Sequence, residues 1–231
     1  MNERITIDSP DGSFGAYVAK PATTPAPAVV VVQEIFGINA DLRETCDQLA
    51  EQGFIAICPD LFWRIQPGVE LTDQSQEEWQ QAMAFYKAFD IEKGVEDIGA
   101  ALETARGYAG ANGKVGVMGF CLGGLMTFLT AARKEPDAAA AYYGGGTDQR
   151  ASEFKSVSCP MILHLGEADE YIPPPAREKI AKAAEAHANV TVYTYAGQNH
   201  AFARHRGTHY DAASAKLANQ RTYDFFKKHL G

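Results

Sequence analysis

Two periodicities alternate along the chain. Short apolar runs rich in β-branched residues, such as AVVVVQE at 28–34 and KVGVMGF at 114–120, are typical of strands buried on both faces. Amphipathic stretches lie between such runs, as at 39–53, where Asn39 is a candidate N-cap and Gly53 a stop signal. Strands that alternate with helices predict a mainly parallel sheet with helices on both faces.

The alternation continues to the end of the chain. Further strands are expected at 54–60, 137–144, 160–167 and 190–196. Further helices are expected at 91–109, 122–134, 174–187 and 210–230. An antiparallel pair, 3–7 and 14–20, precedes them and is joined by the turn composition PDGS. A length of 231 residues suits one α/β domain spanning 1–231.

A polar, aromatic-rich excursion at 61–90 interrupts this pattern. It contains one expected helix, SQEEWQQAMAFYKAF, at 75–89. An excursion between core elements can cover an active site, or it can be a plain surface insertion. Its aromatic residues could line a pocket or pack the helix onto the sheet; they are Trp63, Trp79, Phe85 and Tyr86.

Composition narrows the possible partners. The net charge of −8 and pI of about 5.3 argue against nucleic acid, because phosphate contacts need clustered Lys and Arg. The N-terminal MNERITIDSPDG lacks a signal-peptide core, and no run approaches the roughly 20 apolar residues of a membrane span. We therefore expect a cytoplasmic monomer with no membrane or nucleic-acid partner.

The four cysteines are too widely spaced for a metal cluster or a disulfide scaffold, and no motif requires a metal or organic cofactor. Cys46, Cys58 and Cys159 lie in apolar contexts that are typical of small core residues. Cys121 differs, because it lies in GFCLGG directly after the strand expected at 114–120.

The GxCxG pattern between a strand and a helix matches a nucleophile elbow with cysteine in place of serine. Gly119 and Gly123 would let the strand and the helix approach closely at a strained turn. The helix N-terminus would favour the thiolate of Cys121, and the Leu122 amide could donate to an oxyanion. The alternative is a glycine-rich turn that holds an inert cysteine.

A thiol nucleophile needs a base and an acid that orients the base, in the chain order nucleophile, acid, histidine. Asp169 and His200 each follow an expected strand, so both fall at the C-terminal edge of the sheet. Glu167 is the reserve acid. The remaining candidates, of which His164 is expected to pack in the core, are Asp148, His164, His187, His205 and His209.

Together these motifs resemble the dienelactone hydrolase family, a cysteine-using branch of the α/β hydrolases. The matching pieces run through most of the chain and include VVQEIFGIN, GFIAICPDLF, GKVGVMGFCLGG, YYGGG, GEADEYIP and NHAFAR. The resemblance implies an α/β-hydrolase fold. It also implies hydrolysis of a small lactone or ester through an acyl-enzyme on Cys121, with His200 and Asp169 completing a triad.

The resemblance implies further roles around the nucleophile. Glu34, in QEIFG, would contact the thiol of Cys121 at rest and keep it neutral until a substrate displaces the carboxylate. The Ile35 amide would be the second oxyanion donor. Independently of the family, Glu34 ends an apolar run at the functional edge, where it could be a functional acid or an ordinary strand-terminal carboxylate.

Both a charged residue and aromatic residues are expected to contact the substrate. The family binds the substrate carboxylate with two arginines, and Arg204 in HAFAR matches one of them, which favours an anionic substrate. Trp79 stands where the second arginine is expected, so Arg64 or Arg206 would have to supply the missing contact to the substrate carboxylate. Arg206 is more typical of a solvated surface charge. Phe36 and Tyr86 are further candidates for substrate contact.

Two alternative functions remain open. A carboxylesterase of broad specificity for neutral esters would suit Trp79 in place of an arginine. A non-catalytic thiol-based redox sensor or binding protein is the alternative from another class. The ordered Cys, Asp and His argue against it, because a sensor needs neither an orienting acid nor oxyanion donors.

Overall fold

Eight strands form one sheet in the computed structural model, which describes residues 2–231. They are β1 (Asn2–Ser9), β2 (Gly12–Ala19), β3 (Ala26–Val32), β4 (Ile55–Pro59), β5 (Ala111–Phe120), β6 (Ala138–Tyr142), β7 (Met161–Gly166) and β8 (Val190–Tyr195). Their order in the sheet is β1-β2-β4-β3-β5-β6-β7-β8. β1 and β2 run antiparallel to their neighbours, and every pair from β4 to β8 is parallel.

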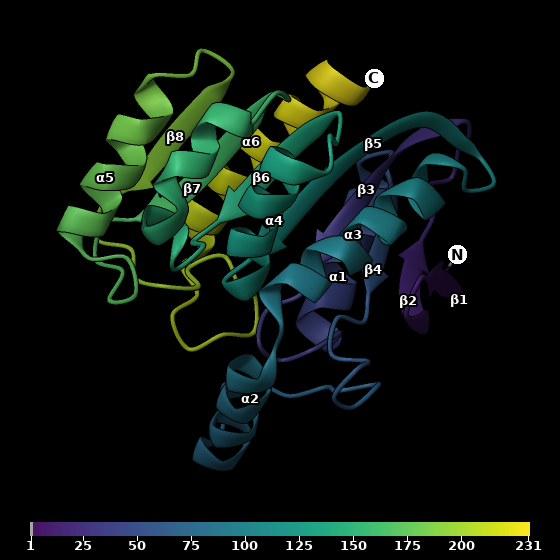
Figure 1. Cartoon of the computed structure of the whole chain (residues 1–231), viewed down its shortest axis with the longest axis horizontal. Helices are drawn as coiled ribbons and strands as arrows, with labels where there is room; N and C mark the ends of the chain where they lie inside the picture. The colour runs from purple at the N-terminus through teal and green to yellow at the C-terminus, as the bar shows by residue number, and fades with distance from the viewer. Residues whose placement is uncertain (1) are drawn as a thin grey trace.

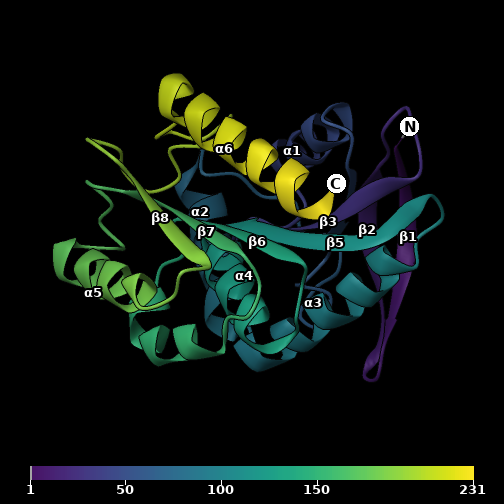
Figure 2. The ribbon, with the colours of Figure 1, turned by 90° about the horizontal axis from the view of Figure 1, so that it is seen from above.

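Helices cover both faces of the sheet. They are α1 (Ala40–Glu51), α2 (Gln76–Ala88), α3 (Ile91–Arg106), α4 (Leu122–Arg133), α5 (Pro174–Glu185) and α6 (Ala212–Leu230), and a 3₁₀ segment spans Thr147–Ser156. Figure 2 shows α1 and α6 on one face, with α3, α4 and α5 on the other. α2 extends from one end of the body instead of lying flat on the sheet (Figure 1).

The predicted α/β-hydrolase fold is confirmed. Each expected strand and helix is present, and the predicted N-cap is correct, because the Asn39 side chain accepts a hydrogen bond from the Leu42 amide at 3.1 Å. Val29 to Val32 in β3 are fully buried, which explains their unbroken apolar run. The 3₁₀ segment was not predicted, because its polar sequence TDQRASEFKS has no helical periodicity.

The sheet topology determines where functional groups can gather. From β3 the chain crosses to β4 on one side and later returns to β5 on the other, so β3 and β5 flank the point where the order reverses. Loops diverge at such a point and leave room for a ligand beyond the carboxyl ends of the strands. The segment after Val32 and the turn after Phe120 therefore meet at one edge.

Gly123 is the point of closest approach between α4 and the end of β3. A Cβ atom there would lie 2.3 Å from the carbonyl oxygen of Val32 and 2.6 Å from that of Gln33. Both are backbone atoms of buried residues, so neither can yield without moving the strand.

We expect Gly123→Ala to lower the free energy of unfolding by about 2–4 kcal/mol, since the added methyl has to push two packed backbones apart. Urea unfolding followed by circular dichroism measures the change. Gly15→Ala is the matched control, because a Cβ there would meet no atom within 4 Å. Equal stabilities of the two variants would contradict the proposed role of the contact.

Candidate active site

Cys121 lies on a strained turn between β5 and α4. Its backbone has φ 55° and ψ −116°, in a region that residues other than glycine rarely adopt. The amide of Cys121 donates to the Tyr142 carbonyl at 3.1 Å, which ties the turn to β6. A Cβ at Gly119 would lie 2.4 Å from the carbonyl oxygen of Gly123, so the tight turn requires small residues at both positions, as predicted.

The N-terminus of α4 points its amides towards the cysteine. Leu122 is the first residue of α4, and amides of the first helical turn have no partner within the helix. The side chain of Cys121 therefore sits at the positive end of the helix dipole, which favours an anion there. The Ile35 segment, which follows β3, borders the same space as Leu122.

His200 and Asp169 form a hydrogen-bonded pair behind the cysteine. Nδ1 of His200 lies 2.9 Å from Oδ2 of Asp169, whose side chain is completely buried. The other oxygen of Asp169 accepts from the amides of Tyr171, at 2.8 Å, and Ile172, at 3.2 Å. These bonds orient the carboxylate, and the carboxylate in turn orients the imidazole.

The charge of the neighbouring groups controls the protonation of His200. Burial lowers the pKa of His200, but the Cys121 thiolate together with hydrogen bonds to Asp169 and Cys121 outweighs burial and raises it to about 10. The sulfur of Cys121 and the carboxylate of Asp169 therefore both stabilise the protonated form of His200. The rings of Tyr143 and Tyr171 stand edge-on to the imidazole at 5.1 Å and 4.8 Å and limit its rotation.

The competing acid and histidine occupy other environments. Glu167 is exposed, whereas Asp169 is buried against His200. His164 is fully buried in the sheet, where its ring nitrogens lie within hydrogen-bond distance of Tyr195 and Thr222. Burial, followed by the charge of Arg221, lowers the pKa of His164 to about 3. His164 is thus a neutral core residue, as predicted.

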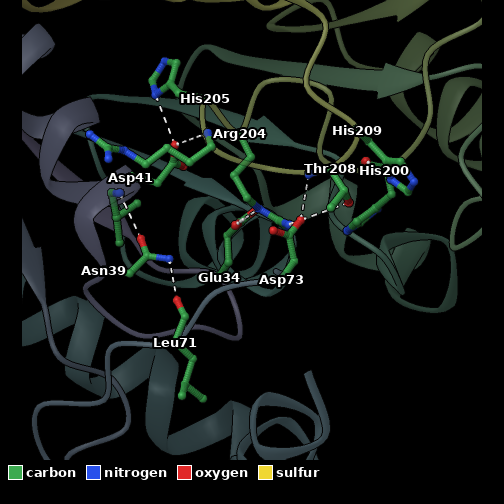
Figure 3. Close-up of polar contacts among 12 residues, drawn as sticks. Glu34, Asn39, Asp41, Leu71, Asp73, His200, Arg204, His205, Thr208 and His209 are labelled. Atoms are coloured by element: carbon green, nitrogen blue, oxygen red, sulfur yellow. Dashed lines mark hydrogen bonds and ion pairs between the residues drawn. The ribbon is translucent and has the colours of Figure 1, made fainter. Parts of the chain in front are cut away.

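Arg204 lies between two carboxylates, as Figure 3 shows. Its Nε and Nη2 donate to Glu34 at 2.5 Å and 3.2 Å, and its Nη1 donates to Asp73 at 2.7 Å. The guanidinium is 7% exposed and lies over the ring of Phe36, 4.8 Å from the ring centre. This group, defined here as the Arg204 cluster, consists of Glu34, Asp73 and Arg204.

Glu34 and Phe36 have contacts that were not predicted. Both carboxylate oxygens of Glu34 accept hydrogen bonds from Arg204, because a guanidinium offers a carboxylate two charge-assisted bonds. The predicted contact of Glu34 with the thiol of Cys121 stays a prediction. Phe36 was predicted to touch the substrate, but it is only 1% exposed and packs beneath Arg204 and Trp79.

A cavity of about 100 Å³ opens above the nucleophile. Its apolar wall consists of Ile35, Trp79, Met83, Leu122 and Leu125. The rest of the lining is Tyr86, Cys121, Gly145, Tyr171, His200 and Arg204. The cavity thus brings together the predicted nucleophile, base and oxyanion segments, and α2 supplies part of its wall.

The two other arginines considered for the substrate do not line this cavity. Arg64 forms ion pairs with Asp97 and Asp11 and lies over the Trp63 ring. The side chain of Arg206 is 64% exposed and pairs with Glu44. Arg204 is therefore the cationic side chain in the cavity lining, and Trp79 occupies the wall where a second was expected.

Sequence reasoning missed several lining residues. Met83 lies one helical turn from Trp79 on α2, and this spacing could have identified it. Tyr171 follows Asp169 by two residues and could have been found from that proximity. Asp73 carried no usable signal, because a single aspartate in a polar loop does not reveal a partner 131 residues away.

In the part of the chain that the structure describes, no group of three or more His, Cys, Asp or Glu side chains could hold a metal ion. None of the helices there is long and apolar enough to cross a membrane.

Comparison with known proteins gives this geometry a context. Residues 14–230 match the model of the family described as the Dienelactone hydrolase family. This chain belongs to the dienelactone hydrolase family. The predicted family resemblance is therefore confirmed, and the protein is a hydrolase.

Similar sequences and structures span nearly all of the hydrolase. A putative carboxymethylenebutenolidase of Azospirillum brasilense is 46% identical over 226 residues, which are 96% of each chain. The carboxymethylenebutenolidase of Pseudomonas putida is 43% identical over 97% of this chain and 96% of its own. The crystal structure of a putative dienelactone hydrolase from Klebsiella pneumoniae superimposes with a TM-score of 0.86 at 26% identity, covering 99% of this chain and 98% of that one.

The pKa of His200 can be tested by NMR titration of the imidazole resonances. We expect His200 of the wild-type hydrolase to stay protonated well above its ordinary pKa of 6.5. Cys121→Ala should lower that pKa, because the thiolate charge is lost and burial then dominates. His164 is the internal control, since it should not titrate near neutral pH. An unchanged His200 pKa in Cys121→Ala would contradict the thiolate–imidazolium interaction.

Proposed function

We propose that the hydrolase cleaves a small ester or lactone through an acyl-enzyme on Cys121. The observation that carries the proposal is that Cys121 and His200 line one cavity while Asp169 is hydrogen-bonded to His200. The relatives from Azospirillum and Pseudomonas are named as carboxymethylenebutenolidases, which supports this class of substrate.

The first half-reaction forms the acyl-enzyme. With the proton of Cys121 held on His200, the thiolate attacks the substrate carbonyl carbon. The amides of Leu122 and Ile35 donate to the developing oxyanion, where preorganised donors are most effective. The tetrahedral intermediate collapses, and His200 returns its proton to the leaving oxygen. In a lactone that oxygen remains attached to the acyl group through the opened ring.

The second half-reaction releases the acid. His200, now neutral, accepts a proton from a water molecule that attacks the thioester. The thiolate leaves, and the imidazolium pairs with it again. Asp169 retains its role throughout, because its bonds to two backbone amides hold the imidazole in one orientation.

Reversible oxidation of Cys121 is less well supported as the primary function. A sensor thiol would not need a buried acid behind His200. The Cys121 side chain is only partly exposed and lies at the end of a cavity large enough for a small organic molecule. These features favour acyl transfer.

Cys121→Ala is expected to abolish hydrolysis of 4-nitrophenyl acetate, and Cys121→Ser to retain only residual activity. Mass spectrometry of the wild-type enzyme with this ester should show an acyl group on Cys121. Cys159→Ala is the control, because burial raises the pKa of the Cys159 thiol to about 11 and keeps it unreactive. Turnover that survives in Cys121→Ala would exclude the proposed nucleophile. Peroxide-reactive Cys121 without ester turnover would support the sensor.

Asp169→Asn should lower kcat by about 10²- to 10⁴-fold, since an amide no longer stabilises the protonated imidazole or its tautomer. Steady-state kinetics with a chromogenic ester measures the loss. Glu167→Gln is the matched control, because Glu167 is exposed two residues away and should leave kcat unchanged. The opposite ranking of the two variants would identify the reserve acid as the functional one.

A further inference from the structure

Arg204 is the arginine in the cavity lining, yet its charge is already neutralised by two carboxylates. Three of its nitrogens donate to the carboxylates of Glu34 and Asp73, both of which are almost completely buried. Two carboxylates around one guanidinium leave the Arg204 cluster with one net negative charge. A carboxylate ligand approaching this wall would meet repulsion unless it displaced one of them.

Asp73 is held in place independently of Arg204. Its Oδ2 also accepts from the amide of Thr208 at 3.0 Å and from the Thr208 hydroxyl at 3.2 Å. Gln74 donates to Asp73 and to the Arg206 carbonyl, which fastens the loop before α2 to the segment after Arg204. The side chain of Asp73 is 7% exposed, so water screens its charge poorly.

Asp73 also remains charged in this environment. Burial by itself raises the pKa of Asp73, but the hydrogen bond from the Thr208 amide and the charge of Arg204 outweigh burial, and the pKa lies below its ordinary value. Protonation near neutral pH therefore does not relieve the repulsion. Figure 3 shows Asp73 and Glu34 on opposite sides of the guanidinium, with Thr208 beside Asp73.

The opposite wall of the cavity is apolar. It is lined by Trp79 and Met83 of α2 and by Leu122 and Leu125 of α4. An uncharged acyl or aryl group gains free energy by burial there, whereas an unpaired charge would lose its hydration without compensation. Both walls therefore favour an uncharged ligand over an anionic one.

We infer that Asp73 is a specificity-determining residue that sets this site for uncharged esters and lactones and against substrates with a carboxylate beside the scissile group. The inference rests on the proposed ester hydrolysis for its kinetic consequence. Its physical core is a net negative cluster of which Arg204 lines the cavity and Asp73 is a direct partner. This core also makes a prediction about ligand binding that does not depend on turnover.

The kinetic test compares two esters that differ in one charge: mono-4-nitrophenyl glutarate and its methyl ester. We expect the wild-type enzyme to have the higher kcat/KM for the neutral methyl ester. Asp73→Asn keeps the shape of the side chain but removes its charge, and should raise the anionic-to-neutral ratio of kcat/KM by at least about tenfold. Asp73→Ala should shift the ratio in the same direction. A general loss of activity cancels in this ratio.

Asp224→Asn is the control for net charge alone. Asp224 lies exposed on α6, and its carboxylate accepts only from Gln220 on the same helix. The ratio in this variant should equal that of the wild type. A wild-type preference for the hemiester, or a ratio that Asp73→Asn leaves unchanged, would overturn the inference.

Calorimetric binding of phenylacetate and phenylacetamide separates this inference from the proposed reaction. We expect the wild type to prefer phenylacetamide, and Asp73→Asn to improve phenylacetate binding relative to the amide by at least about tenfold. If Cys121→Ala still turned over esters, the nucleophile would be wrong, while the binding comparison would continue to test Asp73. Unchanged relative binding in Asp73→Asn would reject the specificity role while the hydrolysis stands.

Discussion

The contact between Gly123 and the end of β3 is the constraint on which the site depends. Because no side chain separates α4 from the carbonyls of Val32 and Gln33, the helix N-terminus lies directly beside the segment that leaves β3. Ile35, Cys121 and Leu122 accordingly line the same cavity. The positive φ of Cys121 follows from the same tight turn, so backbone strain and catalytic placement have one origin.

Electrostatics then divides the site into two parts. On one side, the imidazole of His200 lies between Asp169 and the thiol, which makes proton exchange with sulfur and substrate feasible. On the other side, Arg204 is paired with Glu34 and Asp73 and presents little free positive charge to the cavity. The first part suits the cleavage of an acyl bond, and the second limits the charge that the substrate can carry there.

Sequence reasoning succeeded where a function requires neighbours in the chain. GFCLGG could be recognised because a strained turn, two close approaches and a helix start all fall within six residues. Asp169 and His200 could be placed because each follows a strand, and parallel strands end at one edge. It did not reveal the contacts that Glu34 and Phe36 make with Arg204, because that residue lies far along the chain.

The sequence by itself therefore determined the alternation of strands and helices and the tight glycine-flanked turn at Cys121, because periodicity and turn chemistry are local properties. Only the tertiary structure decided which charges neutralise Arg204. That pairing depends on the contact between the loop before α2 and the segment after Arg204. Because the cluster is buried, water screens the charge of each carboxylate only weakly. A residue without any local motif, Asp73, thus became the one on which the inferred substrate charge depends.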